Sequence, residues 1–368
     1  MPKKTMKKWK VAIVGCGLIT REIYIPQMKN YSQVTLVAVC DTDKSAARDC
    51  AKEFDVPEYY TDMDEMLKEC DFDILMDVAS IAAHHEINMK ALQAGKHLYS
   101  QKPIGLTVDE VSEQIQAAKD NGVKFAASPI HPLRPDIRFI NELIANGSIG
   151  ELMMVRAHTS HGGPEYFQHR QMDPSWFYQP GAGALLDMGV HGLTMVVAVA
   201  GPAKEVSCTA TISQPERTVR SGAFDGQKIK TDYLPDNYII TLNWDNGCIG
   251  VVEAGFCALA STQNMLEIYG TKGTLTILGS IKIGEGDGVR MFLDSPDLQV
   301  RGWIDPLSNA PPRGEFEQAE CLLDLINAIE NDTDPILDPG IAGHVIEIMN
   351  AIPKAIETKT TQLLSTTF

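Results

Sequence analysis

The chain has no long hydrophobic run and no excess of positive charge. No stretch approaches the ~20 consecutive apolar residues that a transmembrane helix needs. Acidic residues number 48 and basic residues 32, a formal charge of −16, which disfavours contact with nucleic acid or an anionic membrane surface. The basic cluster at residues 3–10 lacks the apolar segment of a signal peptide and runs into a predicted strand. We therefore expect a globular protein without a nucleic-acid or membrane partner.

Cysteine pairs are also missing. The eight cysteines, at positions 16, 40, 50, 70, 208, 248, 257 and 321, include no C-x-x-C pair and no close Cys/His set. This scatter predicts reduced, mostly buried thiols in a cytoplasmic protein, and no metal site.

A glycine turn follows the first predicted strand. Residues 10–14 are apolar and rich in β-branched side chains, and they lead through the sequence GCGLIT at 15–20 into a helical pattern. Gly15 and Gly17 allow a tight turn and let the backbone approach a pyrophosphate at the amino end of the helix. Thr20 stands where such turns usually have a third glycine, which predicts slightly wider packing of the helix on the strand.

A carboxylate ends the second predicted strand, at residues 34–40. Asp41 lies 21 residues beyond Thr20, the spacing at which an acidic side chain binds the adenosine ribose hydroxyls. Its charge would repel the extra phosphate of NADP, so the pattern favours NAD, although Lys44 and Arg48 nearby weaken this preference. The alternative is that Asp41 is only a turn residue while Asp43 caps the next helix.

Strands and helices then alternate as in a doubly wound parallel sheet, the Rossmann arrangement. Helices are predicted at 43–54, 62–69, 85–94 and 107–120, the last with a Thr107/Glu110 capping box, and strands at 74–79, 96–100 and 123–127. Ligands of such sheets bind at the carboxyl ends of the strands. The residues that we expect to contact NAD there are Gly15, Gly17, Leu18, Ile19, Asp41, Ser80, His84, Gln101 and Lys102.

Three prolines within residues 128–135 break this alternation and predict a domain border. We expect an NAD-binding domain at 1–129 and a substrate-binding and oligomerisation domain at 130–368. A helix at 137–145 and a strand at 152–158 follow, and the bulky rings at 173–178 either cover a pocket or form a core edge. His131, Arg134 and Trp176 are expected to contact substrate.

Asp187 and His191 form a second chemical pattern, after a glycine-rich stretch at 181–183. If one α-helix includes both, the carboxylate and the imidazole share a face and can position a hydroxyl and take its proton. The alternative, a hydrogen bond on a helix surface, is disfavoured by the glycines and by the upstream nucleotide pattern.

Consecutive strands dominate the rest of the chain, at 205–212, 237–243, 248–257, 265–269 and 274–278. Turn signals at 245–247 and 271–273 predict an antiparallel sheet, and its broad face suits association into a homo-oligomer. Final helices are predicted at 315–330 and 341–357, the second packing near the first domain.

Three motifs in this order resemble the Gfo/Idh/MocA family (glucose-fructose oxidoreductase, inositol dehydrogenase, rhizopine catabolism). They are VAIVGCG at 11–17, AGKH at 94–97 leading to Lys102-Pro103, and GALLDMGVH at 183–191. The resemblance covers nearly the whole chain. It implies an amino-terminal Rossmann domain that binds NAD or NADP, and a carboxy-terminal α/β domain whose open, mostly antiparallel sheet supplies the substrate site and oligomer contacts. It also implies that Lys102 is the catalytic lysine, with Asp187 and His191 as the paired carboxylate and imidazole.

The chain departs from the family pattern at several positions. Gln101 replaces the usual Glu before Lys-Pro, which removes a negative neighbour and favours the neutral amine of Lys102. Ser80 stands in place of a common Pro, with Ala79 in place of Thr, and Thr194 replaces an Asp often found after the histidine. Gln-Lys-Pro, with the His131 and Trp176 loops, is similar to gut-bacterial enzymes that oxidise the 3-hydroxyl of glycosides.

The resemblance thus implies NAD-dependent oxidation of a secondary hydroxyl in a small-molecule sugar, glycoside or cyclitol. His191 would take the proton while Lys102 and Asp187 hold the oxygen, although His191 and Lys102 could exchange roles. Two alternatives stay open. One is a redox-neutral enzyme that recycles bound NAD to cleave or epimerise a glycoside, and the other is a non-catalytic sugar- and NAD-binding relative.

Overall fold

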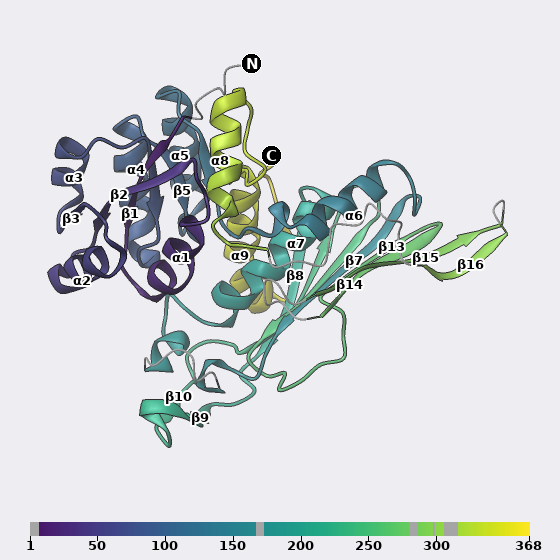
Figure 1. Cartoon of the computed structure of the whole chain (residues 1–368). Coiled ribbons are helices and arrows are strands. Elements are labelled where there is room, and N and C mark those ends of the chain that lie inside the picture. Colours follow the sequence, from purple (N-terminus) through teal and green to yellow (C-terminus); the bar gives the residue numbers. More distant parts are fainter. Residues whose placement is uncertain (1–6, 167–172, 280–285, 297–298, 305–315) are drawn as a thin grey trace, which may run out of the picture. The chain divides into compact units, whose positions relative to one another are not determined.

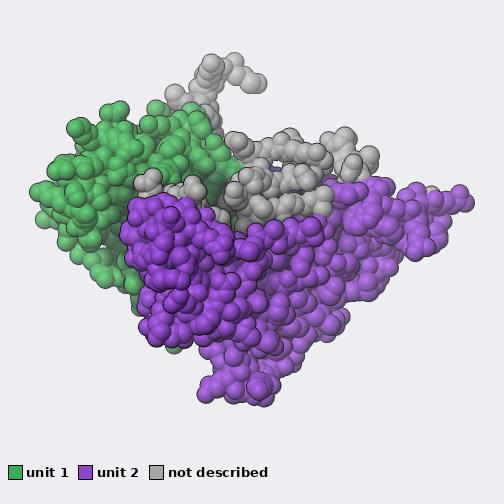
Figure 2. Space-filling model, turned by 90° about the horizontal axis from the view of Figure 1, so that it is seen from below, with its two compact units in different colours: residues 1–133, 316–346, 368 green, residues 134–315, 347–367 purple. Residues whose placement is uncertain are grey.

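The computed structural model describes residues 7–166, 173–279, 286–296, 299–304 and 316–368. The chain folds into two compact units, coloured separately in Figure 2. The first contains residues 1–133, 316–346 and 368, and the second contains residues 134–315 and 347–367. No helix in the described ranges is long and apolar enough to cross a membrane.

A parallel six-stranded sheet forms the centre of the first unit, in the order β3-β2-β1-β4-β5-β6 (Figure 1). The strands are β1 Trp9–Val14, β2 Val34–Cys40, β3 Glu58–Tyr60, β4 Ile74–Asp77, β5 His97–Ser100 and β6 Phe125–Ala127. The middle strands are almost fully buried, as expected for a sheet that helices cover on both faces. The predicted doubly wound sheet is confirmed.

Capped helices connect these strands. A π-helical turn at Thr20–Tyr24 leads into α1 Ile25–Met28, and the unit also contains α2 Lys44–Phe54, α3 Met63–Glu69, α4 His84–Gln93, α5 Val108–Asp120, α8 Glu320–Asn331 and the first turns of α9 Pro339–Thr358. Asp43 and Asp62 cap α2 and α3 through their carboxylates. The predicted Thr107/Glu110 capping box is present at α5.

A nine-stranded sheet forms the second unit, in the order β16-β15-β14-β13-β7-β12-β11-β8-β17. All its neighbours are antiparallel except β7 and β12. The strands are β7 Leu152–Ser160, β8 Glu205–Thr211, β11 Asn237–Asn243, β12 Ile249–Gly255, β13 Leu266–Gly270, β14 Gly273–Gly279, β15 Gly286–Ser295, β16 Val300–Ile304 and β17 Gln362–Leu363. The predicted mostly antiparallel sheet is confirmed.

Two helices lie on this sheet in Figure 1. Helix α7 (Val190–Ala200) packs on β7 and β12, and α6 (Pro135–Ala145) packs against α7. A separate two-stranded sheet pairs β9 (Glu216–Thr218) with β10 (Lys228–Lys230). Short 3-10 helices lie at Ile81–Ala83, His131–Leu133, Pro164–Tyr166, Pro174–Tyr178 and Gly222–Phe224.

Several strands were not predicted: β3, β9, β10, β15, β16 and β17. Strand β15 illustrates the reason, because its sequence GDGVRMFLDS combines two glycines with two aspartates that disfavour strands. Its pairing with β14 overrides that local preference. The predicted helix at 315–330 begins only at Glu320, and residue 315 lies outside the described residues.

Candidate active site

The turn after β1 depends on two glycines for different reasons. Gly15 has a φ of +96°, and a Cβ at this position would lie 2.5 Å from the Val78 carbonyl oxygen. Thr20 closes the turn, because its buried hydroxyl donates a hydrogen bond to the Gly15 carbonyl at 2.6 Å. Around Gly17 no atom lies within 4 Å of the Cβ position. This open side provides the close backbone approach that a pyrophosphate needs.

Asp41 is tied to the same turn. Its Oδ2 accepts the Cys16 N–H at 2.8 Å, and its Oδ1 accepts the Asp43 N–H at 2.9 Å. A carboxylate offers about four acceptor positions, so Asp41 retains capacity for ribose hydroxyls. Leu18 and Ile19 present exposed apolar side chains beside the turn. Together these groups fit a dinucleotide.

Ser80 and His84 follow β4 and were both expected to contact the cofactor, but they differ in exposure. Ser80 is exposed at this edge of the sheet. His84 is only 1% exposed, and its Nδ1 lies 2.7 Å from Oδ2 of the equally buried Asp77. Asp77 also accepts the Ala79 N–H at 3.0 Å. The structure therefore places His84 in an internal pair, and its contact with the cofactor stays a prediction.

Gln101 and Lys102 directly follow β5, which is the neighbour of β4. Because the sheet is parallel, their backbone lies at the same edge as the glycine turn and Ser80. Both side chains are half-buried. The Gln101 N–H donates to the carbonyl of Asp77 at 2.9 Å, which continues the strand pairing up to the lysine.

Asp187 lies within an irregularity of the helix that leads to His191. Residues Leu185–Gly189 form a π-helical turn, and α7 begins at Val190. The sequence interpretation assumed a regular α-helix through both residues, and the wider turn, with its i→i+5 hydrogen bonds, corrects that geometry. Both side chains are half-buried. Single π turns inside helices are frequent at functional sites.

A glycine brings this helix close to the sheet. A Cβ on Gly192 would lie 2.6 Å from Cγ1 of Val252 and 2.9 Å from Oγ1 of Thr159. Val252 belongs to β12 and Thr159 to β7, so only glycine permits this approach. The contact fixes the height of the π turn above the strands.

His131 and Arg134, which were expected to bind substrate, are buried. His131 belongs to the 3-10 turn before the unit border. Arg134 precedes α6 and donates to both carboxylate oxygens of Asp136, from Nε at 3.0 Å and from Nη2 at 2.6 Å. Its charge is matched in place by this bidentate pair. Substrate contacts of both residues stay predictions.

Aromatic rings of the second unit gather around Phe256. Phe177 and Tyr178 meet it edge-on, with centroids 6.5 Å and 5.6 Å away, and His161 stacks on it at 5.0 Å. Trp176 stacks on Phe177 at 3.8 Å and is 43% exposed. Phe177 and Tyr178 therefore belong to the core, as one of the two interpretations expected, whereas Trp176 is accessible and its place over a pocket stays a prediction.

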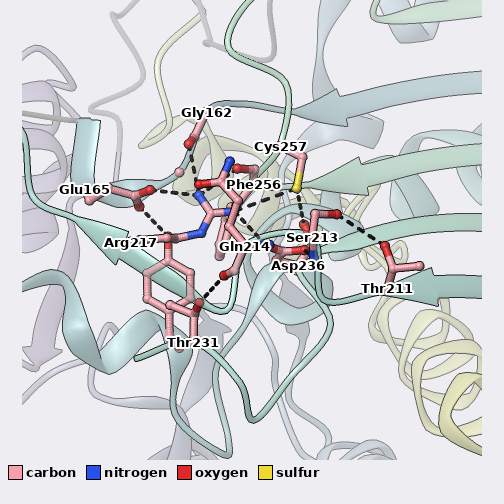
Figure 3. A network of polar contacts seen from close by, with 12 residues as sticks. Gly162, Glu165, Thr211, Ser213, Gln214, Arg217, Thr231, Asp236, Phe256 and Cys257 are labelled. Atoms are coloured by element: carbon pink, nitrogen blue, oxygen red, sulfur yellow. Dashed lines mark hydrogen bonds and ion pairs between the residues drawn. The ribbon is translucent and has the colours of Figure 1, made fainter. Parts of the chain in front are cut away.

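Arg217 lies at the centre of a buried charged network beside these rings (Figure 3). Its Nη1 donates to Oε1 of Glu165 and its Nη2 to Oδ2 of Asp236, both at 2.8 Å, and the Tyr178 hydroxyl donates to Glu165. All three charged residues are at most 3% exposed. Burial opposes the charge on Arg217, but hydrogen bonding to Asp236 and Glu165 outweighs it and raises the pKa of the guanidinium. One cation and two carboxylates leave a formal charge of −1.

The same network joins chain segments that are far apart in sequence. Arg217 also donates to the carbonyls of Gly162 at 3.2 Å and Phe256 at 2.9 Å. Asp236 accepts the N–H groups of Ser213 at 2.6 Å and Gln214 at 3.1 Å. No local motif announces this arrangement, and the sequence interpretation missed it. Its effect is to support the segment that carries Trp176.

The site residues divide between the units. Lys102, His131 and the predicted cofactor contacts belong to the first unit, and Arg134, Trp176, Asp187 and His191 belong to the second. In the described part of the chain, no cluster of His, Cys, Asp or Glu could hold a metal ion. All eight cysteines are free thiols, as predicted.

Comparison with known families covers both units. Residues 9–128 match the oxidoreductase family with an NAD-binding Rossmann fold, and residues 137–276 match the GFO/IDH/MocA C-terminal domain. The chain belongs to the GFO/IDH/MocA family. It is therefore an NAD-binding oxidoreductase, which confirms the resemblance, the cofactor and the enzyme class inferred from the motifs.

Curated relatives of this family member are distant in sequence. D-glucoside 3-dehydrogenase of Escherichia coli is 25% identical over 296 residues, covering 78% of this chain and 82% of the relative. Myo-inositol 2-dehydrogenase of Thermotoga maritima is 21% identical over 267 residues, covering 72% of this chain and 74% of the relative.

Solved structures share the fold. Levoglucosan dehydrogenase, in complex with NADH and L-sorbose, superposes with a TM-score of 0.81 at 19% identity, covering 98% of this chain and 99% of that one. Aldose-aldose oxidoreductase from Caulobacter crescentus, in complex with glycerol, gives 0.78 at 18% identity, covering 97% and 100%. These similarities confirm the two-part α/β architecture.

Proposed function

We propose that this GFO/IDH/MocA oxidoreductase oxidises a secondary hydroxyl of a sugar, glycoside or cyclitol, with Lys102, Asp187 and His191 as its catalytic residues. The observation that carries the proposal is the position of Lys102 at the carboxyl end of β5, at the same edge of the parallel sheet as the glycine turn. That edge is where ligands of such sheets bind. The relatives named above act on a glucoside and an inositol, which supports this substrate class.

Each side chain has a role that suits its chemistry. NAD, when bound, accepts a hydride from the substrate carbon. His191 takes the hydroxyl proton as general base, since an imidazole titrates near neutral pH. Asp187, on the adjacent π turn, orients the imidazole or the hydroxyl. Lys102 donates a hydrogen bond to the reacting oxygen and stabilises its developing negative charge.

Trp176 is our candidate for contact with the sugar ring. Its ring is the most exposed of the aromatic cluster, and an indole offers a large rigid face with one hydrogen-bond donor. We propose carbon 3 of a glycoside as the oxidised position, because of the resemblance of Gln101-Lys102-Pro103 to glycoside 3-oxidising enzymes and the similarity to D-glucoside 3-dehydrogenase.

A substrate panel tests the proposal. The purified chain is incubated with NAD and with hexoses, alkyl glucosides and inositols, while NADH absorbance is followed and products are identified by mass spectrometry. Lys102→Ala and His191→Ala should bind NAD normally and lose turnover by about 100-fold or more. Lys119→Ala, on the exposed face of α5, is the matched control. Normal turnover in both site variants would contradict the assignment, and altered product without NADH would indicate the redox-neutral reaction instead.

We also propose that the enzyme is a homo-oligomer through the second unit's sheet. Ile239 and Ile249 are exposed on the neighbouring strands β11 and β12. Exposed apolar side chains on a broad sheet face favour association. Analytical ultracentrifugation of the wild type and Ile239→Asp should show a particle that becomes smaller in the variant, and a monomeric wild type would refute the idea.

A further inference from the structure

The Gln101 side chain is held at both ends. Its Oε1 accepts the backbone N–H of Lys102 at 3.1 Å, and its Nε2 donates to the hydroxyl of Tyr24. A backbone N–H can only donate, so the amide atom that faces it must be the oxygen. The amide nitrogen therefore faces Tyr24, and the orientation of the group is fixed by chemistry.

Tyr24 is itself anchored in the core of the first unit. Its hydroxyl lies 2.9 Å from the hydroxyl of Tyr99, and the two rings meet edge-on with centroids 6.0 Å apart. Both residues are fully buried, and burial raises the pKa of both hydroxyls, so both stay protonated. The Tyr24 hydroxyl thus accepts from Gln101 and shares a second hydrogen bond with Tyr99, in which either hydroxyl can donate. The hydrogen bonds link Gln101 to the interior of the unit.

These contacts converge on a short piece of backbone. Tyr99 lies in β5, and Gln101 continues its pairing by donating its N–H to the carbonyl of Asp77 at 2.9 Å. Tyr24 comes from the π turn that follows the glycine turn. The strand that leads to Lys102 and the helix that begins at the cofactor turn are thus joined through the amide of Gln101.

We propose that Gln101 is a positioning residue, which fixes the backbone from which Lys102 projects by linking its N–H to the buried Tyr24–Tyr99 pair. The inference rests on the proposed catalytic role of Lys102. In this role the neutral amide of Gln101 holds the backbone and places no negative charge next to the Lys102 amine.

Two substitutions of Gln101 distinguish the effect of its side-chain size from the effect of its hydrogen bonds. Gln101→Met keeps the side-chain length and loses both hydrogen bonds. Gln101→Glu keeps them, since a carboxylate accepts from both the Lys102 N–H and the Tyr24 O–H, with the Tyr24 hydrogen bond reversed. Gln27→Met is the matched control, because Gln27 also accepts a backbone N–H through its Oε1, that of Ala319 at 3.0 Å, in the same unit.

The experiment combines hydrogen exchange with kinetics on the NAD-bound full chain. In Gln101→Met, exchange of the Lys102 amide should be about tenfold faster, because its acceptor is gone. With the best substrate of the sugar panel, kcat should fall about tenfold or more. Gln101→Glu should restore slow exchange and most of kcat, and Gln27→Met should change neither.

The outcomes separate this inference from the proposed function. Unchanged Lys102 exchange in Gln101→Met, or faster exchange with wild-type kcat, would overturn the positioning role. A fall in kcat of equal size in Gln27→Met would reduce it to general destabilisation and overturn it as well. A wild type that turns over no sugar of the panel would refute the proposed function, and Lys102 exchange would then decide by itself whether Gln101 anchors this backbone.

Discussion

The two units support their candidate site residues with networks of opposite character. In the first unit, neutral groups of Gln101, Tyr24 and Tyr99 form a buried hydrogen-bond chain beside Lys102. In the second, Arg217 is buried with two carboxylates beside the aromatic cluster. A neutral chain loses a few hydrogen bonds when one member is removed, whereas a charged network loses its charge balance. The two units should therefore lose different amounts of stability when a member of each network is substituted.

The largest loss should follow removal of the cation. Arg217→Met would leave Glu165 and Asp236 buried without their partner, and breaking a buried pair in this way costs about 3–5 kcal/mol. We expect a large decrease in the urea midpoint of the second unit, followed through the fluorescence of Trp176 and its neighbours. A loss below about 1 kcal/mol would show that water or rearrangement compensates the two carboxylates.

Acid should weaken the same network. Burial opposes ionisation of Asp236, but its hydrogen bonds with Arg217 and the Ser213 N–H prevail and hold its pKa below the ordinary value of 3.8. A carboxyl whose folded pKa is depressed stabilises the protein above its unfolded pKa and loses that contribution as pH falls through the folded value. Unfolding midpoints measured from about pH 7 to pH 3 should therefore fall less steeply in Asp236→Asn than in wild type. Parallel curves would contradict this.

The neutral chain should be less sensitive. Tyr24→Phe removes one hydroxyl and leaves the Gln101 amide and the Tyr99 hydroxyl each short of a buried partner, at a cost of about 1–3 kcal/mol. Urea unfolding of the first unit measures this loss. Tyr31→Phe is a useful comparison, because the Tyr31 hydroxyl donates to Glu317 in a half-buried setting. A loss in Tyr24→Phe greater than that in Arg217→Met would reverse the proposed ranking.

The smallest effect should come from an ion pair on the same small sheet as Arg217. Lys228 lies 2.9 Å from Glu216, and their side chains are 65% and 62% exposed. Exposed pairs of this kind contribute about 0–1 kcal/mol. Lys228→Met should thus leave the urea midpoint nearly unchanged. A large loss would mean that the β9–β10 sheet, rather than burial of charge, governs stability here.

Much of the first unit was predictable because its signals are local. The glycine turn and the Thr107/Glu110 capping box are short patterns of residues that lie close in sequence. Asp41 was recognised by its fixed distance from the glycine turn along the sequence. Strands such as β9 and β15 escaped prediction, because their pairing outweighs weak local preference. The π turn that contains Asp187 escaped prediction for a related reason, since the spacing of Asp187 and His191 cannot distinguish it from a regular turn of α-helix.

The sequence by itself determined the family, the cofactor and the doubly wound class of the first sheet, because short periodic patterns and turn residues encode them. Only the tertiary structure revealed what holds the site residues in place. Tyr24 and Gln101 are 77 residues apart, and Glu165 and Arg217 are 52 apart. Pairing over such distances depends on how whole elements pack, and no local pattern of residues records it.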